Sequence, residues 1–170
     1  MKNILVFLLF AFSSPAFAEW TSVNKVDAFS DEMVRYAVYD DENHRVQISH
    51  QGTAVWMFVS RKKIGTFEPN KLIELRVDKN KTFEFNPPAM NKILAASGLK
   101  AYQWEPATIG FLIWHGLEDR GCGYIDQLIS GEKLSVRYWT NTMERDSFSI
   151  SLAGAKEALV DGLDLKTCGK

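Results

Sequence analysis

The stretch LISGEKLSVRYWTNTMERDSFSISLAGAKEALVDG, from Leu128 to Gly162, carries the clearest structural pattern in the chain. Two of its segments, 134–139 and 147–152, alternate between apolar and polar residues on either side of a polar loop. A period of two is typical of a half-buried β-strand, because successive side chains leave opposite faces of the pleat. The stretch therefore predicts a β-hairpin followed by a short helix over about 154–162.

The rest of the chain predicts further strands joined by short polar turns. We expect them at 20–26, 33–39, 46–50, 54–60, 72–77, 82–85 and 109–114. Segments 54–60 and 109–114 are apolar on both faces, which favours central, buried positions. Short helices are expected over 89–97 and 124–129. The pattern predicts a mainly β fold with minor α content, an antiparallel β-sandwich or roll of about eight or nine strands with two or three short helices.

The first 18 residues have the features of a cleavable signal peptide. Lys2 is followed by an apolar run, and Ala16-Phe17-Ala18 places small residues at the cleavage positions. The run is shorter than the roughly 20 residues that a membrane-spanning helix needs. We therefore expect residues 19–170 to form a single exported domain, periplasmic or secreted.

The charge balance argues against two classes of partner. The formal net charge is −1 at pH 7, whereas proteins that bind nucleic acids or anionic membranes usually carry a basic excess. After the leader, no apolar stretch is long enough to span a bilayer. We expect no nucleic-acid partner and no membrane span in the mature chain.

The two cysteines, Cys122 and Cys168, both follow the leader. An even cysteine count in an exported chain predicts a disulfide. The bridge would close a loop of about 47 residues and stabilise the fold by about 4 kcal/mol, because it restricts the unfolded chain. The alternative is a redox-active pair, but the C-x-x-C spacing that lowers a thiol pKa is not present.

Several segments occur in an order that resembles a group of exported proteins. After the leader and a strand that begins at Trp20 come Arg76-Val77-Asp78, a Lys-Leu-x-Val-Arg-Tyr strand at 133–138, and Ser-Phe-Ser-Ile-Ser-Leu-Ala-Gly at 147–154 running into a helix, with Cys168 near the end. The pattern is similar to the periplasmic invasion-associated locus B proteins and to the type VI secretion accessory (VasI/TagO-like) proteins. Those families often carry a cysteine in the strand that corresponds to 46–50, and this chain has none. The resemblance implies a β-sandwich-like exported module without catalytic residues.

Motifs for catalysis and for metal binding are missing from the sequence. The three histidines, His44, His50 and His115, have no spacing that places two ligands on one face, and neither a zinc motif nor a nucleophile elbow occurs. The carboxylates of 40–43 lack the EF-hand spacing and favour a solvated turn. Ser151 and the pair Glu118 and Asp119 carry no specific signal. We expect no enzyme activity, no cofactor and no metal.

Five tryptophans are many for a chain of this length. Trp104 and Trp114 lie in apolar surroundings, whereas Trp139 shares a strand face with Ser135 and Arg137. Tryptophan and arginine are enriched at protein interfaces, so Arg137 and Trp139 are a candidate contact surface. The alternative is that these rings fill the core or cover a sheet edge.

Three functions compete on these grounds. The first is a non-enzymatic accessory module that binds another envelope or host protein. The second is an inhibitor or immunity protein against an enzyme that acts on the cell wall, with the loop 118–123 as the inhibitory segment. The third is a small hydrolase or ligand-binding protein with a site inside the roll, formed by two carboxylates or by His50 with His115.

Overall fold

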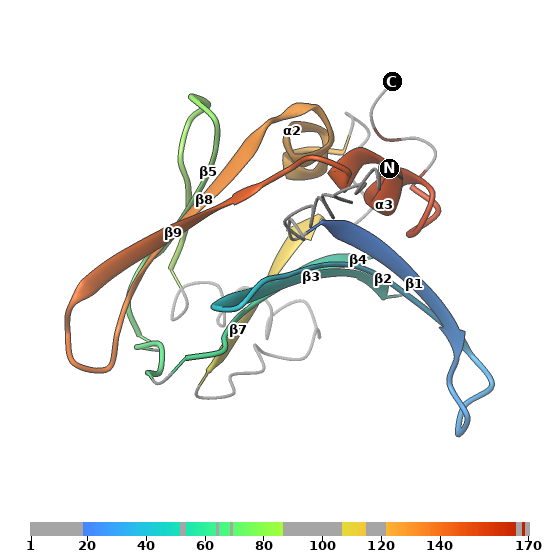
Figure 1. The fold of residues 1–170 in the computed structure, drawn as a ribbon, viewed down its shortest axis with the longest axis horizontal. Coiled ribbons are helices and arrows are strands. Elements are labelled where there is room, and N and C mark those ends of the chain that lie inside the picture. The colour runs from blue at the N-terminus through green and yellow to red at the C-terminus, as the bar shows by residue number, and fades with distance from the viewer. Residues whose placement is uncertain are drawn as a thin grey trace, which may run out of the picture.

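The computed structural model describes residues 19–51, 54–63, 65–68, 70–86, 107–114, 122–165 and 168. In these residues nine strands form two antiparallel sheets that share one apolar core (Figure 1). The predicted mainly β, sandwich-like class is confirmed. The expected helix over 89–97 and Trp104 lie outside the described residues.

The elements follow the predicted segments closely. In chain order they are β1 Trp20–Val26, β2 Met33–Asp40, β3 His44–Gln51, β4 Ala54–Arg61, β5 Ile73–Val77, β6 Phe83–Phe85, β7 Thr108–Trp114, α2 Tyr124–Ser130, β8 Lys133–Trp139, β9 Arg145–Ser151 and α3 Ala155–Val160. The five-stranded sheet has the order β1-β2-β3-β4-β7, and the four-stranded sheet has the order β6-β5-β8-β9. The hairpin predicted within Leu128–Gly162 is β8–β9, and α3 follows it.

The position of β7 corrects one prediction. The segment 109–114 was expected to be a central strand, but in the described part of the chain β7 pairs only with β4 and ends the five-stranded sheet. Its inner face is apolar because it packs on the other sheet, where Phe111 stacks on Phe85 at 4.6 Å between ring centroids. On its outer face, Gly110 lies against the ring of Phe58, so closely that a Cβ there would be 2.7 Å from Cε1. Burial on both faces therefore does not require a central position.

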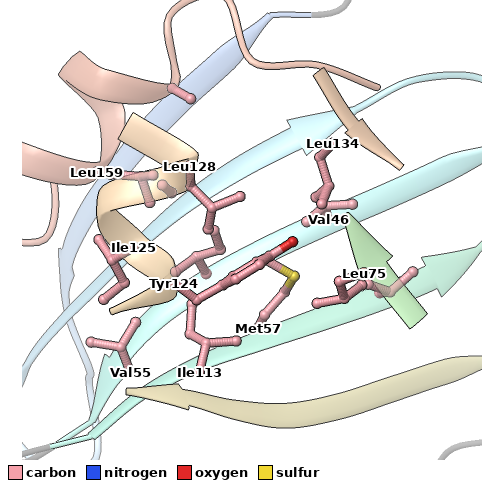
Figure 2. Packing of buried hydrophobic residues seen from close by; sticks show 14 of the residues in the cluster. Val46, Val55, Met57, Leu75, Ile113, Tyr124, Ile125, Leu128, Leu134 and Leu159 are labelled. Carbon is pink, nitrogen blue, oxygen red and sulfur yellow. The ribbon is translucent and has the colours of Figure 1, made fainter. Parts of the chain in front are cut away.

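The core lies between the two sheets and under the helices. One cluster of buried side chains joins both sheets, α2 and α3 (Figure 2). The labelled members are Val46, Val55, Met57 and Ile113 from the five-stranded sheet, Leu75 and Leu134 from the four-stranded sheet, Tyr124, Ile125 and Leu128 from α2, and Leu159 from α3. Each large apolar side chain that is fully buried in this way stabilises the fold by about 1.5–3 kcal/mol.

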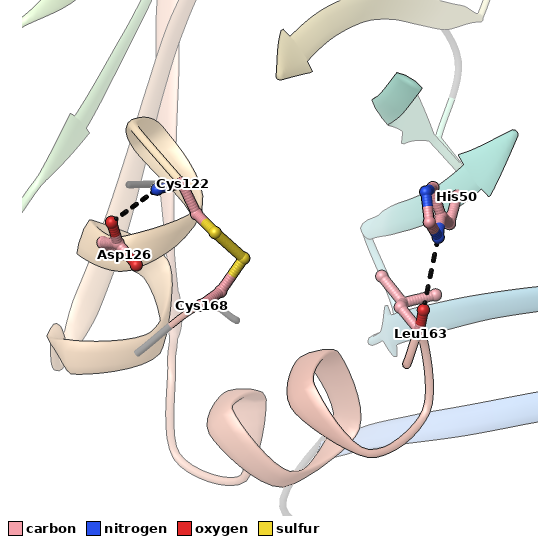
Figure 3. Close-up of a disulfide and its surroundings, with 5 residues drawn as sticks. All are labelled: His50, Cys122, Asp126, Leu163 and Cys168. Carbon is pink, nitrogen blue, oxygen red and sulfur yellow. Dashed lines mark hydrogen bonds between the residues drawn. A yellow bond between two sulfur atoms is a disulfide. The ribbon is translucent and has the colours of Figure 1, made fainter. Parts of the chain in front are cut away.

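The helix α3 lies close against the first strand of the chain. An added Cβ at Gly162, just after α3, would be 2.3 Å from Cβ of Ser22 in β1 and 2.2 Å from the carbonyl oxygen of Ala158. Only glycine allows this approach. His50 Nδ1 in β3 donates a hydrogen bond to the carbonyl oxygen of Leu163 at 3.4 Å (Figure 3). The sheet is therefore tied to the segment that follows α3.

The predicted disulfide between Cys122 and Cys168 is present (Figure 3). The two residues are 46 positions apart in sequence, their Cα atoms are 5.4 Å apart, and both are buried. The backbone N–H of Cys122 donates to Asp126 Oδ2 at 2.9 Å, which fixes the start of α2. The bridge joins α2 to the segment beyond α3, so neither helix can leave the sheets independently. Neither helix in the described part of the chain has the length or apolar content needed to cross a bilayer.

Replacing both cysteines by serine is expected to lower the free energy of unfolding by about 4 kcal/mol, because the unfolded chain regains the entropy of the open loop. Chemical denaturation of the two proteins measures the difference. Adding a reductant should shift the wild-type midpoint toward that of the double variant and leave the variant unchanged. Equal midpoints for the oxidised wild type and the double variant would contradict this role.

Tyr124 introduces a polar group into the core without a partner. Its side chain is 4% exposed, and within the described residues its hydroxyl has no hydrogen-bond partner. Burial raises the pKa of this phenol above its ordinary value. An unsatisfied buried hydroxyl costs about 1–3 kcal/mol. Tyr138 is also buried, but its hydroxyl donates to Asp146 Oδ2 at 2.9 Å.

The two tyrosines form a matched pair for a stability test. We expect Tyr124→Phe to raise the free energy of unfolding by about 1 kcal/mol, because it removes an unpaired buried hydroxyl. Tyr138→Phe should lower it by about 1.5–3 kcal/mol, because it breaks a hydrogen bond to a carboxylate. Urea denaturation of both variants tests this, and a destabilised Tyr124→Phe would show that the hydroxyl is satisfied.

Candidate interaction surfaces

Alternation in β5, β8 and β9 places a polar row of side chains on the side of the four-stranded sheet that faces away from the core. We call it the outer sheet face; it consists of Glu74, Arg76, Ser135, Arg137, Trp139, Arg145, Ser147 and Ser149. Part of this face lines a shallow concavity of about 360 Å³. The hydroxyls of Ser135 and Ser149 lie 2.9 Å apart across the β8–β9 pair.

The two residues predicted as a contact surface both lie on the outer sheet face. The Arg137 side chain is 52% exposed, and its Nη1 is 3.5 Å from Oε1 of Glu74. The other carboxylate oxygen of Glu74, Oε2, pairs with Arg145. Trp139 is half-buried, and Lys71 Nζ lies 5.8 Å from the centroid of its ring. Both side chains are therefore held by neighbours, and their part in binding stays a prediction.

A second surface is the end of the β1–β2 hairpin. β1 and β2 pair as far as Val26 and Met33, but β3 joins β2 only from Tyr36 onward, so the last pairs extend beyond the sheet (Figure 1). We call residues 26–33 the hairpin tip. Val26, Phe29 and Met33 there are 57%, 101% and 53% exposed, and they are three of the five large apolar side chains that the described residues expose.

The turn in the hairpin tip is a defined structure. Asp27 Oδ1 accepts hydrogen bonds from the backbone N–H groups of Phe29 and Ser30 at 2.9 and 3.0 Å. These bonds hold the pKa of the Asp27 carboxyl below its usual value. The backbone N–H of Asp31 closes the turn on the carbonyl of Asp27 at 2.9 Å. The turn therefore fixes Phe29 at the outermost point of the hairpin.

A third group of side chains lies where the ends of β4, β8 and β9 meet. The Arg61 guanidinium carbon lies 5.3 Å from the centroid of the Tyr138 ring, and Nη2 is 3.7 Å from Asp146 Oδ2. Burial, together with the hydrogen bond to Asp146, raises the pKa of the Tyr138 phenol to about 12. A cation, a carboxylate and a phenol from both sheets thus converge at this edge of the sandwich.

His44 joins the two sheets beside this group. Its ring stacks on Phe148 of β9 with 3.8 Å between centroids and 11° between planes. Burial lowers the pKa of the imidazole, and the positive charges of Arg61 and Lys63 act in the same direction. The carboxylates of Asp41 and Asp146 oppose the shift, but the net direction is downward. The folded protein therefore favours a neutral His44.

The lowered pKa of His44 makes folding depend on pH in a defined direction. In the unfolded chain the imidazole binds a proton near pH 6.5, and in the folded protein only at lower pH. As the pH falls below about 6.5, the unfolded state gains protons first, so the free energy of unfolding decreases until the folded pKa is reached. Denaturation midpoints at pH 7 and pH 5 should differ more for the wild type than for His44→Gln. Equal pH dependence of the two proteins would contradict this assignment.

The other residues considered from the sequence have structural roles or lie outside the described ranges. The carbonyl of Ser151 accepts the indole N–H of Trp20 at 2.9 Å. Asp41 Oδ1 accepts the backbone N–H groups of Asn43 and His44, each at 2.7 Å, so the acidic segment 40–43 is a hydrogen-bonded turn. His115, Glu118 and Asp119 lie outside the described residues, as does most of the loop 118–123. Within the described ranges no three His, Cys, Asp or Glu side chains cluster as a metal site would require.

Comparison of the chain with known protein families, curated proteins and solved structures gives no match. The resemblance to the invasion-associated locus B and VasI/TagO-like proteins therefore stays a prediction. The function rests on the chemistry of the surfaces described above.

Sequence reasoning missed the hairpin tip and the Arg61 group. Phe29 sits among polar turn residues, and a single aromatic residue in a predicted turn was a usable signal of exposure. Arg61 is the last residue of β4, and its side chain is only 16% exposed. No local pattern indicates that Arg61 meets Tyr138 and Asp146, because they come from the other sheet.

Proposed function

We propose that this protein is an exported, non-enzymatic module that binds another protein of the envelope or of a host through its hairpin tip. The single observation that carries the proposal is the exposure of Val26, Phe29 and Met33 together at the end of a hairpin that extends beyond its sheet. Apolar side chains gathered on an exposed, structured element are typical of protein interfaces.

Export is supported by the predicted signal peptide and by the disulfide. A bridge between Cys122 and Cys168 persists in an oxidising compartment such as the periplasm or the extracellular space. It also suits a small module that must keep its shape outside the cell. The partner is therefore expected in the same compartment.

The charges of the hairpin tip indicate the chemistry of the partner. Asp27, Asp31 and Glu32 surround Phe29, while the nearest cation along β1 is Lys25. Arg35, farther from the turn, pairs with Asp164 at 3.4 Å. The matching surface is an apolar pocket for Phe29 with lysine or arginine side chains at its rim, because complementary charge favours encounter and orientation.

A photo-reactive phenylalanine analogue at position 29 tests the proposal in the cells that produce the protein. We expect the analogue at position 29 to form a covalent adduct with one envelope or host protein. A control variant that carries the analogue at position 156, an exposed residue of α3, should form none. Replacing both Val26 and Met33 by serine should reduce the yield of the adduct at least tenfold, since most of the apolar contact is lost.

A third probe at position 139 separates the two candidate surfaces. An adduct at 139 and none at 29 would reject the hairpin tip and favour the outer sheet face with Arg137 and Trp139. Equal adducts at 29 and 156 would show nonspecific contact and contradict a binding site at the tip. The denaturation midpoints of the variants at positions 26, 29 and 33 should match the wild type, since none of these three residues belongs to the core cluster.

A second candidate is inhibition of an enzyme that acts on the cell wall. It is favoured by the shape of the hairpin tip, since an extended turn with one projecting aromatic residue can enter an active-site cleft. The identity of the protein cross-linked at position 29 decides between the candidates. A cell-wall hydrolase whose activity falls on binding, and recovers with Phe29→Ser, would assign the inhibitor function.

A site inside the sandwich is not favoured. The space between the sheets is occupied by the apolar cluster, which includes the stacked rings of Phe85 and Phe111 and the edge-to-face pair of Phe67 and Tyr138 at 4.8 Å. The polar clefts of the described residues lie at the surface instead.

A further inference from the structure

A cleft of about 690 Å³ opens where β8 turns into β9. The β8–β9 turn and the β1–β2 hairpin lie on opposite sides of the molecule (Figure 1). Three separate segments line it: the end of β4, the loop at 65–66 and the turn that leads into β9. The backbone N–H of Asn141 donates to the carbonyl of Thr66 at 3.1 Å and holds the turn against the loop. The lining residues are Arg61, Gly65, Thr66, Thr140, Asn141, Thr142, Glu144, Arg145 and Asp146.

Arg61 is held in position at this cleft before any ligand arrives. Its side chain is 16% exposed, and the guanidinium lies over the ring of Tyr138, where a cation is attracted to the π face. Gly65 leaves room for it, because a Cβ at that position would be 2.6 Å from Arg61 Nη1. Gly65 also has φ of +133°, a conformation that other residues rarely adopt.

The guanidinium retains donors for a ligand. Its nearest carboxylate oxygen, Asp146 Oδ2, is 3.7 Å from Nη2, which is beyond hydrogen-bond distance, and that oxygen already accepts the Tyr138 hydroxyl at 2.9 Å. Within the described residues the Arg61 side chain makes no hydrogen bond. The planar fork of a guanidinium binds a carboxylate through two parallel hydrogen bonds.

The neighbouring charges narrow the class of ligand. Asp146 has a side chain that is 49% exposed beside Arg61, and Glu144 is exposed on the same wall. These carboxylates repel a simple anion but attract an ammonium group. Arg145, the other cation of the wall, already pairs with Glu74 of the outer sheet face. Apart from Arg145, the cleft therefore presents one cation, Arg61, beside two carboxylates, Asp146 and Glu144.

We propose that this cleft is a binding site for a zwitterionic α-amino acid group, free or within a larger molecule. The carboxylate would pair with Arg61, and the ammonium on the adjacent carbon would pair with Asp146, with Glu144 in support. The hydroxyls and amide of Thr66, Thr142 and Asn141 provide further hydrogen-bonding groups around it. This site is independent of the hairpin tip, and neither one requires the other.

Three related probes test the assignment on the oxidised, full-length mature protein. Alanine carries both charges, alaninamide lacks the carboxylate, and N-acetylalanine lacks the ammonium. We expect saturable changes in the backbone amide NMR signals of Thr66, Asn141 and Asp146 with alanine. The dissociation constants of both derivatives should be at least tenfold higher, because each loses a charged hydrogen-bonding partner.

Variants at Arg61 separate binding from folding. Arg61→Gln should abolish the response to alanine, and Arg61→Lys, which keeps the charge but not the fork, should weaken it about tenfold or more. Arg76→Gln, an arginine on the outer sheet face, is the matched control and should bind as the wild type does. If Arg61→Gln does not fold, the affinity of Arg61→Lys for alanine alone tests the role of the guanidinium.

Three results would overturn the proposal: no saturable response of the wild type to alanine, equal binding of N-acetylalanine, or an unchanged response of Arg61→Lys. Equal binding of N-acetylalanine would leave an anion site that ignores the ammonium group. None of these results bears on cross-linking at position 29, so failure of this site and failure of the proposed function are distinguishable.

Discussion

The packing of one apolar sheet face on the other is the contact on which the rest of the structure depends. The four-stranded sheet depends on this contact most, because β8 and β9 alternate strictly and Leu134, Val136 and Ile150 can be buried only toward the five-stranded sheet. The stacked rings of Phe85 and Phe111 mark where the sheets meet. Once this face is buried, the opposite face of the four-stranded sheet must be polar, and the position of Arg137 and Trp139 on it follows.

A disulfide holds one end of the sandwich together, and noncovalent contacts between the sheets hold the opposite edge. Near the helices, a covalent bond joins Cys122 to Cys168 and fixes α2 relative to the end of the chain. At the other edge the links are noncovalent and titratable: His44 of β3 stacks on Phe148 of β9, and Arg61 of β4 meets Tyr138 and Asp146. The first kind of closure is insensitive to pH. The second weakens when the half-buried imidazole of His44 gains a proton, so acid is expected to loosen the sandwich at the Arg61 edge before the helix end.

The sequence predicted what depends on local periodicity and little of what depends on long-range neighbours. Alternation located β8 and β9 and assigned Trp139 to the outer face, because a period of two fixes the face of each side chain. Cysteine counting found the disulfide, since only two cysteines were available. Periodicity does not fix the order of strands in a sheet, so the sequence favoured a central position for β7, which ends its sheet among the described strands. It also could not bring Arg61 next to Asp146, 85 positions away and in the other sheet.

The hairpin tip is difficult to explain by stability alone. Between Tyr36 and the turn, no third strand pairs with the β1–β2 ladder in the described part of the chain, and a two-stranded hairpin is at best marginally stable in water. Its base is nevertheless secured, because Gly162 allows α3 to approach Ser22 and Arg35 pairs with Asp164. Asp27 orders the turn, and Phe29 gains no burial from that order. Ordering a segment costs conformational entropy, so a rigid turn that presents an unburied aromatic ring lowers stability unless something covers it. A partner that buries Phe29 recovers the apolar free energy that folding leaves unused, and a preordered tip reduces the entropy lost on binding.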